Sequence, residues 1–117
     1  MSYSVITAKL DNESGVHAQV TTDAGSPWFA GHFPGEPILP GIAQLYMVTE
    51  CIERVLHKKM ILQNLVRIKF KQLIRPGDVL DIRAVAGKKE NNYTFNIKNN
   101  DKEVCSGRLV LVPHKEQ

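Results

Sequence analysis

The chain contains little cysteine and none of the residue spacings that mark a metal site. Its two cysteines, Cys51 and Cys105, are far apart in the sequence and belong to no Cys-x-x-Cys or Cys/His ligand pattern. A Gly-rich phosphate loop, a paired-carboxylate motif and a Gly-x-Ser-x-Gly elbow are absent as well. We therefore expect two buried free thiols, no metal and no cofactor.

Long apolar runs and an excess of charge of one sign are also missing. No stretch reaches the roughly 18 uninterrupted apolar residues that a membrane helix needs, and the N-terminus lacks a basic start followed by an apolar run. The formal charge of +3 is spread through both signs, and the densest basic cluster, His57-Lys58-Lys59, is too short for a nucleic-acid-binding stripe. These absences predict a soluble, cytoplasmic protein that binds neither a membrane nor a nucleic acid.

The composition fits one globular domain. Hydrophobic residues make up 43% of the 117 residues and charged residues 23%, which is ordinary for a folded protein. No internal repeat or low-complexity tract is visible. We expect residues 1–117 to form a single domain.

One helix is predicted after Pro40-Gly41. Side chains of one helix face recur there at three- and four-residue spacing, and the helix should end near His57-Lys58-Lys59. The residues of this face are Ile42, Leu45, Thr49, Ile52 and Leu56.

Strand-like segments surround the helix. Residues 4–10 and 15–22 are typical of a hairpin before it, and residues 61–73, 78–86, 93–98 and 103–112 are typical of four strands after it. Apolar and polar residues alternate clearly in 79–85 and 105–111, as expected for strands with one face on a core. An α+β fold is predicted, with one helix packed on an antiparallel sheet.

The loop from residue 31 to residue 41 is the most distinctive segment. Its sequence, Gly-His-Phe-Pro-Gly-Glu-Pro-Ile-Leu-Pro-Gly, holds three prolines and three glycines. This mixture of fixed and permissive backbone is suited to hold His32 in one place. On composition alone, an active-site role for His32 and a simple turn of the chain have about equal support.

The order of residues in this loop resembles the signature of the 3-hydroxyacyl-acyl-carrier-protein dehydratases. In that family a histidine precedes a Phe-Pro-Gly turn, and a Pro-Gly opens the central helix. The resemblance extends to residues 27–29, 68–71, 75–78 and 104–108, so it covers nearly the whole chain. It implies a hotdog fold, which is a highly curved antiparallel sheet wrapped around one long helix, in agreement with the elements predicted above.

The resemblance also implies an active site that removes water from a β-hydroxyacyl thioester. The family's histidine corresponds to His32, and a histidine is suited to accept the α-proton because its ordinary pKa is about 6.5. The family's helix-opening glycine corresponds to Gly41, where the N–H groups of the helix start stabilise charge on the thioester oxygen. Phe33 and Ile42, beside these two residues, are expected to contact the substrate. We expect the backbone carbonyl of Ile38 to orient the His32 ring.

One position departs from the family's pattern. The family has Glu or Asp five residues beyond the helix-opening glycine, where this chain has Tyr46. A phenol donates a proton or orients a water, but it is a poorer base and a weaker acid than a carboxyl group. Glu50, about 6 Å further along the helix axis, is a candidate helper. Packing for Tyr46 and a surface position for Glu50 are the simpler interpretations. We assign no role to Glu36, His17, His57 or His114.

Two classes of function follow. The first is a hydro-lyase that converts 3-hydroxyacyl thioesters on acyl carrier protein to trans-2-enoyl thioesters, in fatty-acid synthesis or a related lipid or polyketide pathway. His32 is its base, and Tyr46 or Glu50 assists. The second is a catalytically weak or inactive hotdog protein that binds an acyl carrier or pairs with an active homologue. The intact loop favours the enzyme, and a hotdog thioesterase fits the loop less well.

The resemblance implies the assembly too. In the family each active site takes its histidine from one subunit and its helix residue from the other. We therefore expect a homodimer whose sheets join edge to edge, with Tyr46 facing His32 across the interface. A trimer of dimers is compatible with the sequence. Acyl-chain length and the choice between acyl carrier protein and coenzyme A are left open.

Overall fold

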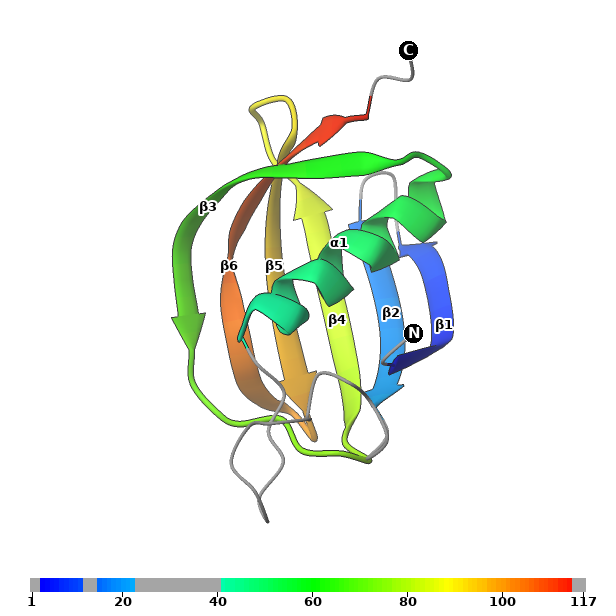
Figure 1. Ribbon diagram of the computed structural model, residues 1–117, viewed down its shortest axis with the longest axis vertical. Helices are drawn as coiled ribbons and strands as arrows, with labels where there is room; N and C mark the ends of the chain where they lie inside the picture. The colour runs from blue at the N-terminus through cyan, green and yellow to red at the C-terminus, as the bar shows by residue number, and fades with distance from the viewer. Residues whose placement is uncertain (1–2, 12–14, 23–40, 115–117) are drawn as a thin grey trace.

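The computed structural model describes residues 3–11, 15–22 and 41–114 of the chain. These contain, in order, β1 (Tyr3–Asp11), β2 (Gly15–Thr22), α1 (Gly41–Leu56), β3 (Met60–Phe70), β4 (Val79–Ala86), β5 (Asn92–Asn99) and β6 (Lys102–Pro113). The strands form one antiparallel sheet in the order β1-β2-β4-β5-β6-β3. Figure 1 shows this sheet curving around α1, which crosses its inner face diagonally. Within the described ranges, the predicted single helix on a curved antiparallel sheet is confirmed.

The core lies between α1 and the inner face of the sheet. Side chains that alternate along β2, β4, β5 and β6 point inward, among them Val20, Ile82, Ile97 and Leu109, all with no exposed surface. Each such aliphatic side chain stabilises the fold by about 1.5–3 kcal/mol when it is fully buried. We call the opposite side of the sheet, which faces away from α1, the outer face.

The C-terminal end of α1 is closed by local hydrogen bonds. His57 adopts a left-handed conformation with φ of 54°, and the amide of Lys58 donates to the carbonyl of Glu53 at 3.3 Å. This is the bond pattern that commonly ends a helix. The Glu53 carboxylate also accepts the amide of Met60 at 2.8 Å, which ties the helix end to the start of β3. No helix in the described ranges is long and apolar enough to cross a membrane.

β3 is shorter than predicted. The expected strand over residues 61–73 ends at Phe70 instead. The amides of Lys71 and Gln72 both donate to the carbonyl of Val104, at 2.8 and 3.3 Å, so the regular ladder with β6 stops there. Extending the strand to residue 73 was wrong, because the bonds to Val104 depend on a contact with a distant segment and no local sequence pattern indicates them.

A bulge interrupts the pairing of β3 with β6. The register shifts between Val66 and Lys69, and Arg67 takes a left-handed φ of 52°. The bulge presses β3 against Gly107 of β6, where a Cβ would lie 2.5 Å from Ile68 Cδ1 and 3.0 Å from Ile68 Cα. Gly107 also has a φ of 158°, which side chains rarely adopt. A residue without a side chain is therefore required opposite the bulge.

Replacing Gly107 with Ala should destabilise the protein by about 2 kcal/mol or more, because the new Cβ overlaps the backbone of Ile68 and cannot be relieved by a side-chain rotation. The matched control is Gly87→Ala, whose Cβ would meet Asn92 at ordinary contact distances of 3.5 and 3.6 Å. Urea unfolding measures both changes. Similar midpoints for Gly107→Ala and Gly87→Ala would show that β3 does not approach Gly107 this closely.

Candidate functional site

The residues predicted for the site divide into two groups. Gly41, Ile42, Tyr46 and Glu50 all lie in α1. The residues of the second group, His32, Phe33 and Ile38, lie outside the described residues. The bond expected between the His32 ring and the Ile38 carbonyl therefore stays a prediction.

Gly41 begins α1 in contact with an aromatic ring from β3. A Cβ on Gly41 would lie 2.7 Å from Cζ of Phe70 and 3.0 Å from its Cε1. The missing side chain thus makes room for Phe70, in addition to any approach of a substrate to the amide. Sequence reasoning did not select Phe70, although it falls in the 68–71 segment that carries part of the resemblance. Its ring packs directly against the start of α1.

Ile42, Tyr46 and Glu50 form a stripe along the outward side of α1. Their four-residue spacing stacks them on one side of the helix. Ile42 is 47% exposed and Tyr46 51%, while Glu50 is partly buried. Placing Ile42 on the inward face with Leu45 was therefore wrong. On a wheel of 100° per residue, the buried residues of α1 span a wide arc that is centred opposite Tyr46. The arc is wide because the curved sheet covers the helix on more than one side.

Exposed apolar side chains of α1 and β3 share one side of the molecule. Leu65 and Phe70 are 41% and 52% exposed, and they pair in the sheet with the buried Leu109 and Cys105, which places them on the α1 side of β3. We call Ile42, Tyr46, Leu65 and Phe70 the apolar patch. β3 is an edge strand beside this patch. An exposed apolar patch next to an open sheet edge is typical of a surface that binds another chain.

The two cysteines do not supply a nucleophile to the site. Cys51 and Cys105 are free thiols with no exposed surface, as predicted. Burial raises the pKa of each thiol to about 12, so both are neutral at pH 7. Among the described residues there is also no group of His, Cys, Asp and Glu that could hold a metal ion.

Two histidines without an assigned role lie away from the stripe on α1. His17 sits on the outer face of β2, and its Nε2 is 3.3 Å from Oδ1 of Asp81. His57 is exposed just beyond the end of α1. Neither of these described histidines belongs to the start of α1, where Gly41 meets the ring of Phe70.

Known proteins resemble the chain in sequence. A family model described as ApeI dehydratase, ApeI-like, matches residues 8–108. The 3-hydroxyacyl-[acyl-carrier-protein] dehydratase FabZ of Pediococcus pentosaceus is 29% identical over 115 residues, which cover 89% of this chain and 76% of that protein. FabZ of Chlamydia trachomatis is 37% identical over 82 residues, which cover 62% of this chain and 54% of that protein. The match therefore spans only about half of the Chlamydia relative.

Solved structures resemble the chain in fold. The dehydratase heterocomplex ApeI:P from Xenorhabdus doucetiae gives a TM-score of 0.83 at 25% identity, covering 95% of this chain and 98% of that one. An uncharacterized protein of Erwinia carotovora gives 0.77 at 29% identity, covering 99% and 100%. A hypothetical thioesterase of Streptococcus pneumoniae with coenzyme A gives 0.63 at 12% identity, covering 98% and 88%, and shows the fold alone.

The sequence match and the structural match agree. The family model covers most of the chain, from β1 to β6, and the Xenorhabdus structure matches the fold over 95% of this chain. The chain belongs to the ApeI-like dehydratase family and has the hotdog fold.

Proposed function

We propose that this chain is a hydro-lyase that dehydrates 3-hydroxyacyl thioesters on acyl carrier protein to trans-2-enoyl thioesters, in fatty-acid synthesis or a related lipid or polyketide pathway. The observation that carries the proposal is the family's histidine loop, intact in front of Gly41, in a chain of the dehydratase family. The FabZ relatives are named for this substrate class. The resemblance supplies the role of His32.

In the proposed reaction the neutral His32 ring accepts the α-proton of the thioester. The electron pair of the broken C–H bond forms the double bond between the α and β carbons, while the bond from the β carbon to its hydroxyl breaks. The hydroxyl takes up a proton from the Tyr46 phenol, or from a water that Tyr46 orients, and leaves as water, and the proton taken by His32 returns to that donor through solvent. N–H groups at the start of α1, beginning at Gly41, stabilise the charge on the thioester oxygen. Phe33 and Ile42 contact the substrate beside these groups.

Tyr46 assists the departure of the hydroxyl in this proposal. Its side chain lies on the outward stripe of α1 and is half exposed in the single subunit, so it is available to a site shared with a second subunit. Glu50 follows one turn later on the same stripe and is the next candidate. Glu53 is less suited, because its carboxylate already accepts the Met60 amide.

The reaction is assayed with a 3-hydroxybutyryl or crotonyl thioester by following the absorbance of the enoyl group. His32→Ala should lower the rate by about 100-fold or more, the range of a lost general base, and leave the unfolding transition nearly unchanged. His114→Ala is the matched control, because His114 is exposed near the end of the described chain. Equal rates for wild type and His32→Ala would remove His32 from the mechanism.

Tyr46→Phe should lower turnover by about 10-fold or more, because it removes only the hydroxyl from the outward stripe. Tyr46→Glu places the family's carboxylate at this position and should raise turnover above that of Tyr46→Phe. Steady-state rates on one thioester, with circular dichroism to check folding, measure both effects. If Tyr46→Phe is as active as wild type, Tyr46 has no part in the reaction and Glu50→Gln becomes the variant to measure.

The apolar patch and the open edge of β3 support a homodimer joined along β3. Edge-to-edge pairing would complete the backbone hydrogen bonds of β3 and bring Ile42 and Tyr46 toward the second subunit. A site shared in this way takes Tyr46 from one subunit and His32 from the other. A trimer of such dimers is compatible with the proposal.

Sedimentation at micromolar concentration should show a dimer or a multiple of it. Leu65→Asp places a charge in the apolar patch and should shift the protein toward monomer and reduce turnover, because an unpaired buried charge opposes association. Val85→Asp is the matched control, since Val85 is a similar side chain, 51% exposed, on β4, an interior strand that does not pair with β3. A wild-type protein that sediments only as a monomer would contradict the shared site.

A second candidate function has its own support. Tyr46 stands where the family has a carboxylate, and the Xenorhabdus neighbour is described as part of a dehydratase heterocomplex. The chain would then be a weak or inactive subunit that binds an acyl carrier or pairs with an active homologue. Retained binding of acyl carrier protein, with no turnover by wild type or by Tyr46→Glu, would favour this function over the enzyme.

We place either function in the cytoplasm. Two reduced thiols are ordinary in a reducing compartment. Acyl carrier proteins are acidic, and complementary basic surface would speed their encounter with this chain.

A further inference from the structure

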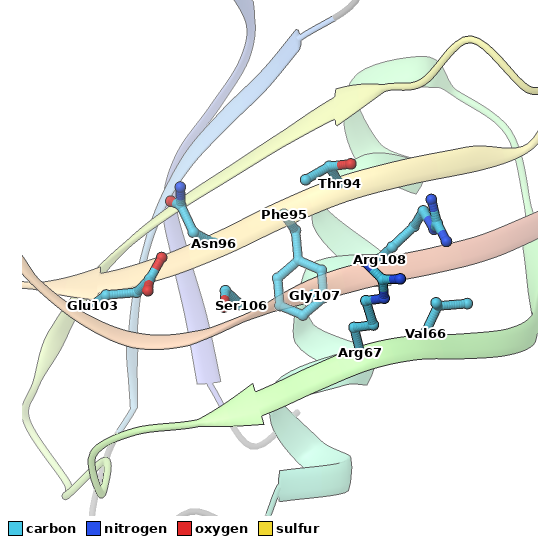
Figure 2. A pocket seen from close by; sticks show the side chains of 9 residues that line it. All are labelled: Val66, Arg67, Thr94, Phe95, Asn96, Glu103, Ser106, Gly107 and Arg108. Atoms are coloured by element: carbon cyan, nitrogen blue, oxygen red, sulfur yellow. The ribbon is translucent and has the colours of Figure 1, made fainter.

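A hollow of about 350 Å³ lies where β3, β5 and β6 meet. Figure 2 shows the side chains that line it. Its polar side chains belong to the outer face of the sheet: Thr94 and Asn96 flank the inward Phe95, and Arg108 precedes the inward Leu109. The volume falls within the range of about 300–1,000 Å³ that is usual for small-molecule sites. The hollow is on the opposite side of the sheet from α1 and the candidate active site.

Two arginines supply the charge of this pocket. Arg108 pairs with Val66 in the sheet, and Arg67 is the next residue along β3, so both guanidinium groups reach the same hollow. Figure 2 shows the two side chains on neighbouring strands at one end of the pocket. Neither takes part in the ion pairs of the described residues, and the pocket's one carboxylate, Glu103, is paired with Lys71. The pocket therefore carries positive charge that is not neutralised within the described chain.

The position of Arg67 depends on a strained backbone. Arg67 has a left-handed φ of 52°, which costs about 1–2 kcal/mol for a residue with a side chain, and Gly107 is needed opposite it. A glycine at position 67 would relieve this strain, yet the chain has an arginine there. β-bulges often change the direction of a side chain beside a binding site, and this bulge brings the guanidinium of Arg67 next to that of Arg108.

The neutral side chains of the pocket add two hydroxyl groups, which both donate and accept hydrogen bonds, and one amide. Thr94 and Ser106 present hydroxyl groups on the two strands beside Arg108. Oδ1 of Asn96 is buried and has no hydrogen-bond partner among the described residues. A buried acceptor of this kind costs free energy until it meets a donor. A ligand that satisfies the pocket therefore combines an anionic group with a hydroxyl or N–H group.

We propose that this pocket binds a small phosphate ester that carries a hydroxyl group near its phosphate, as a sugar phosphate does. Arg67 and Arg108 hold the phosphate, with Thr94 and Ser106 as further donors, and Asn96 accepts the hydroxyl of the ligand. A phosphate fits better than a carboxylate, because it offers three acceptor oxygens and close to two negative charges to this set of donors. The site is independent of the proposed dehydration.

Calorimetric titration of the whole chain with ribose 5-phosphate tests the proposal, with ribose and inorganic phosphate as separate probes. Ribose 5-phosphate should bind with one site per chain and more tightly than inorganic phosphate, and ribose alone should not bind. Arg67→Gly retains the left-handed backbone and removes the guanidinium, so the protein should fold at least as stably as wild type and bind about 10-fold or more weakly. Arg108→Gln should weaken binding similarly.

Two further variants separate the contributions. Lys88→Gln removes one positive charge from the exposed turn between β4 and β5 and should leave binding unchanged. Asn96→Ala should weaken ribose 5-phosphate and leave inorganic phosphate unchanged. The proposal is overturned if ribose 5-phosphate shows no saturable binding at millimolar concentration, if Arg67→Gly binds as wild type does, or if Lys88→Gln loses as much affinity as the arginine variants.

Discussion

A wide arc of α1 packs against the inner face of the sheet, and the positions of the described site residues follow from that contact. The side chains from Ala43 to Ile52 that point toward the sheet are almost fully buried, so the helix cannot rotate without exposing them. Ile42 and Tyr46 are consequently held outward, next to the open edge of β3. The same packing brings the first residue of the helix, Gly41, under the ring of Phe70.

The periodicity of the sequence predicted most of this framework. The helix and the six strands were located to within a few residues, because their core residues alternate or recur at helical spacing. The end of β3 was missed since the amides of Lys71 and Gln72 share the Val104 carbonyl, a contact between distant segments. Ile42 was misplaced because a three- and four-residue pattern assumes a narrow buried face, whereas the curved sheet buries a broad one.

The site was less predictable than the fold. Gly41 and Tyr46 were selected through the resemblance, by counting along the helix, and their places in α1 are as counted. The contact of Gly41 with Phe70 joins residues almost thirty positions apart, and no local sequence pattern predicts it. The left-handed conformation of Arg67 was not predicted either, because an arginine in the sequence does not indicate that conformation. A glycine within a strand often marks a bulge, and Gly107 was the residue that could have indicated this one.

The curved sheet thus separates two surfaces. Its inner side holds α1, the helix start and the apolar patch, while its outer side holds the pair of arginines. The proposed dehydration takes place on the inner side, and intact-mass spectrometry of acyl carrier protein loaded with a 3-hydroxybutyryl group tests it most directly. Wild-type protein should remove one water molecule from the loaded carrier, and His32→Ala should not. A carrier mass left unchanged by folded, dimeric wild-type protein would contradict the proposed dehydration.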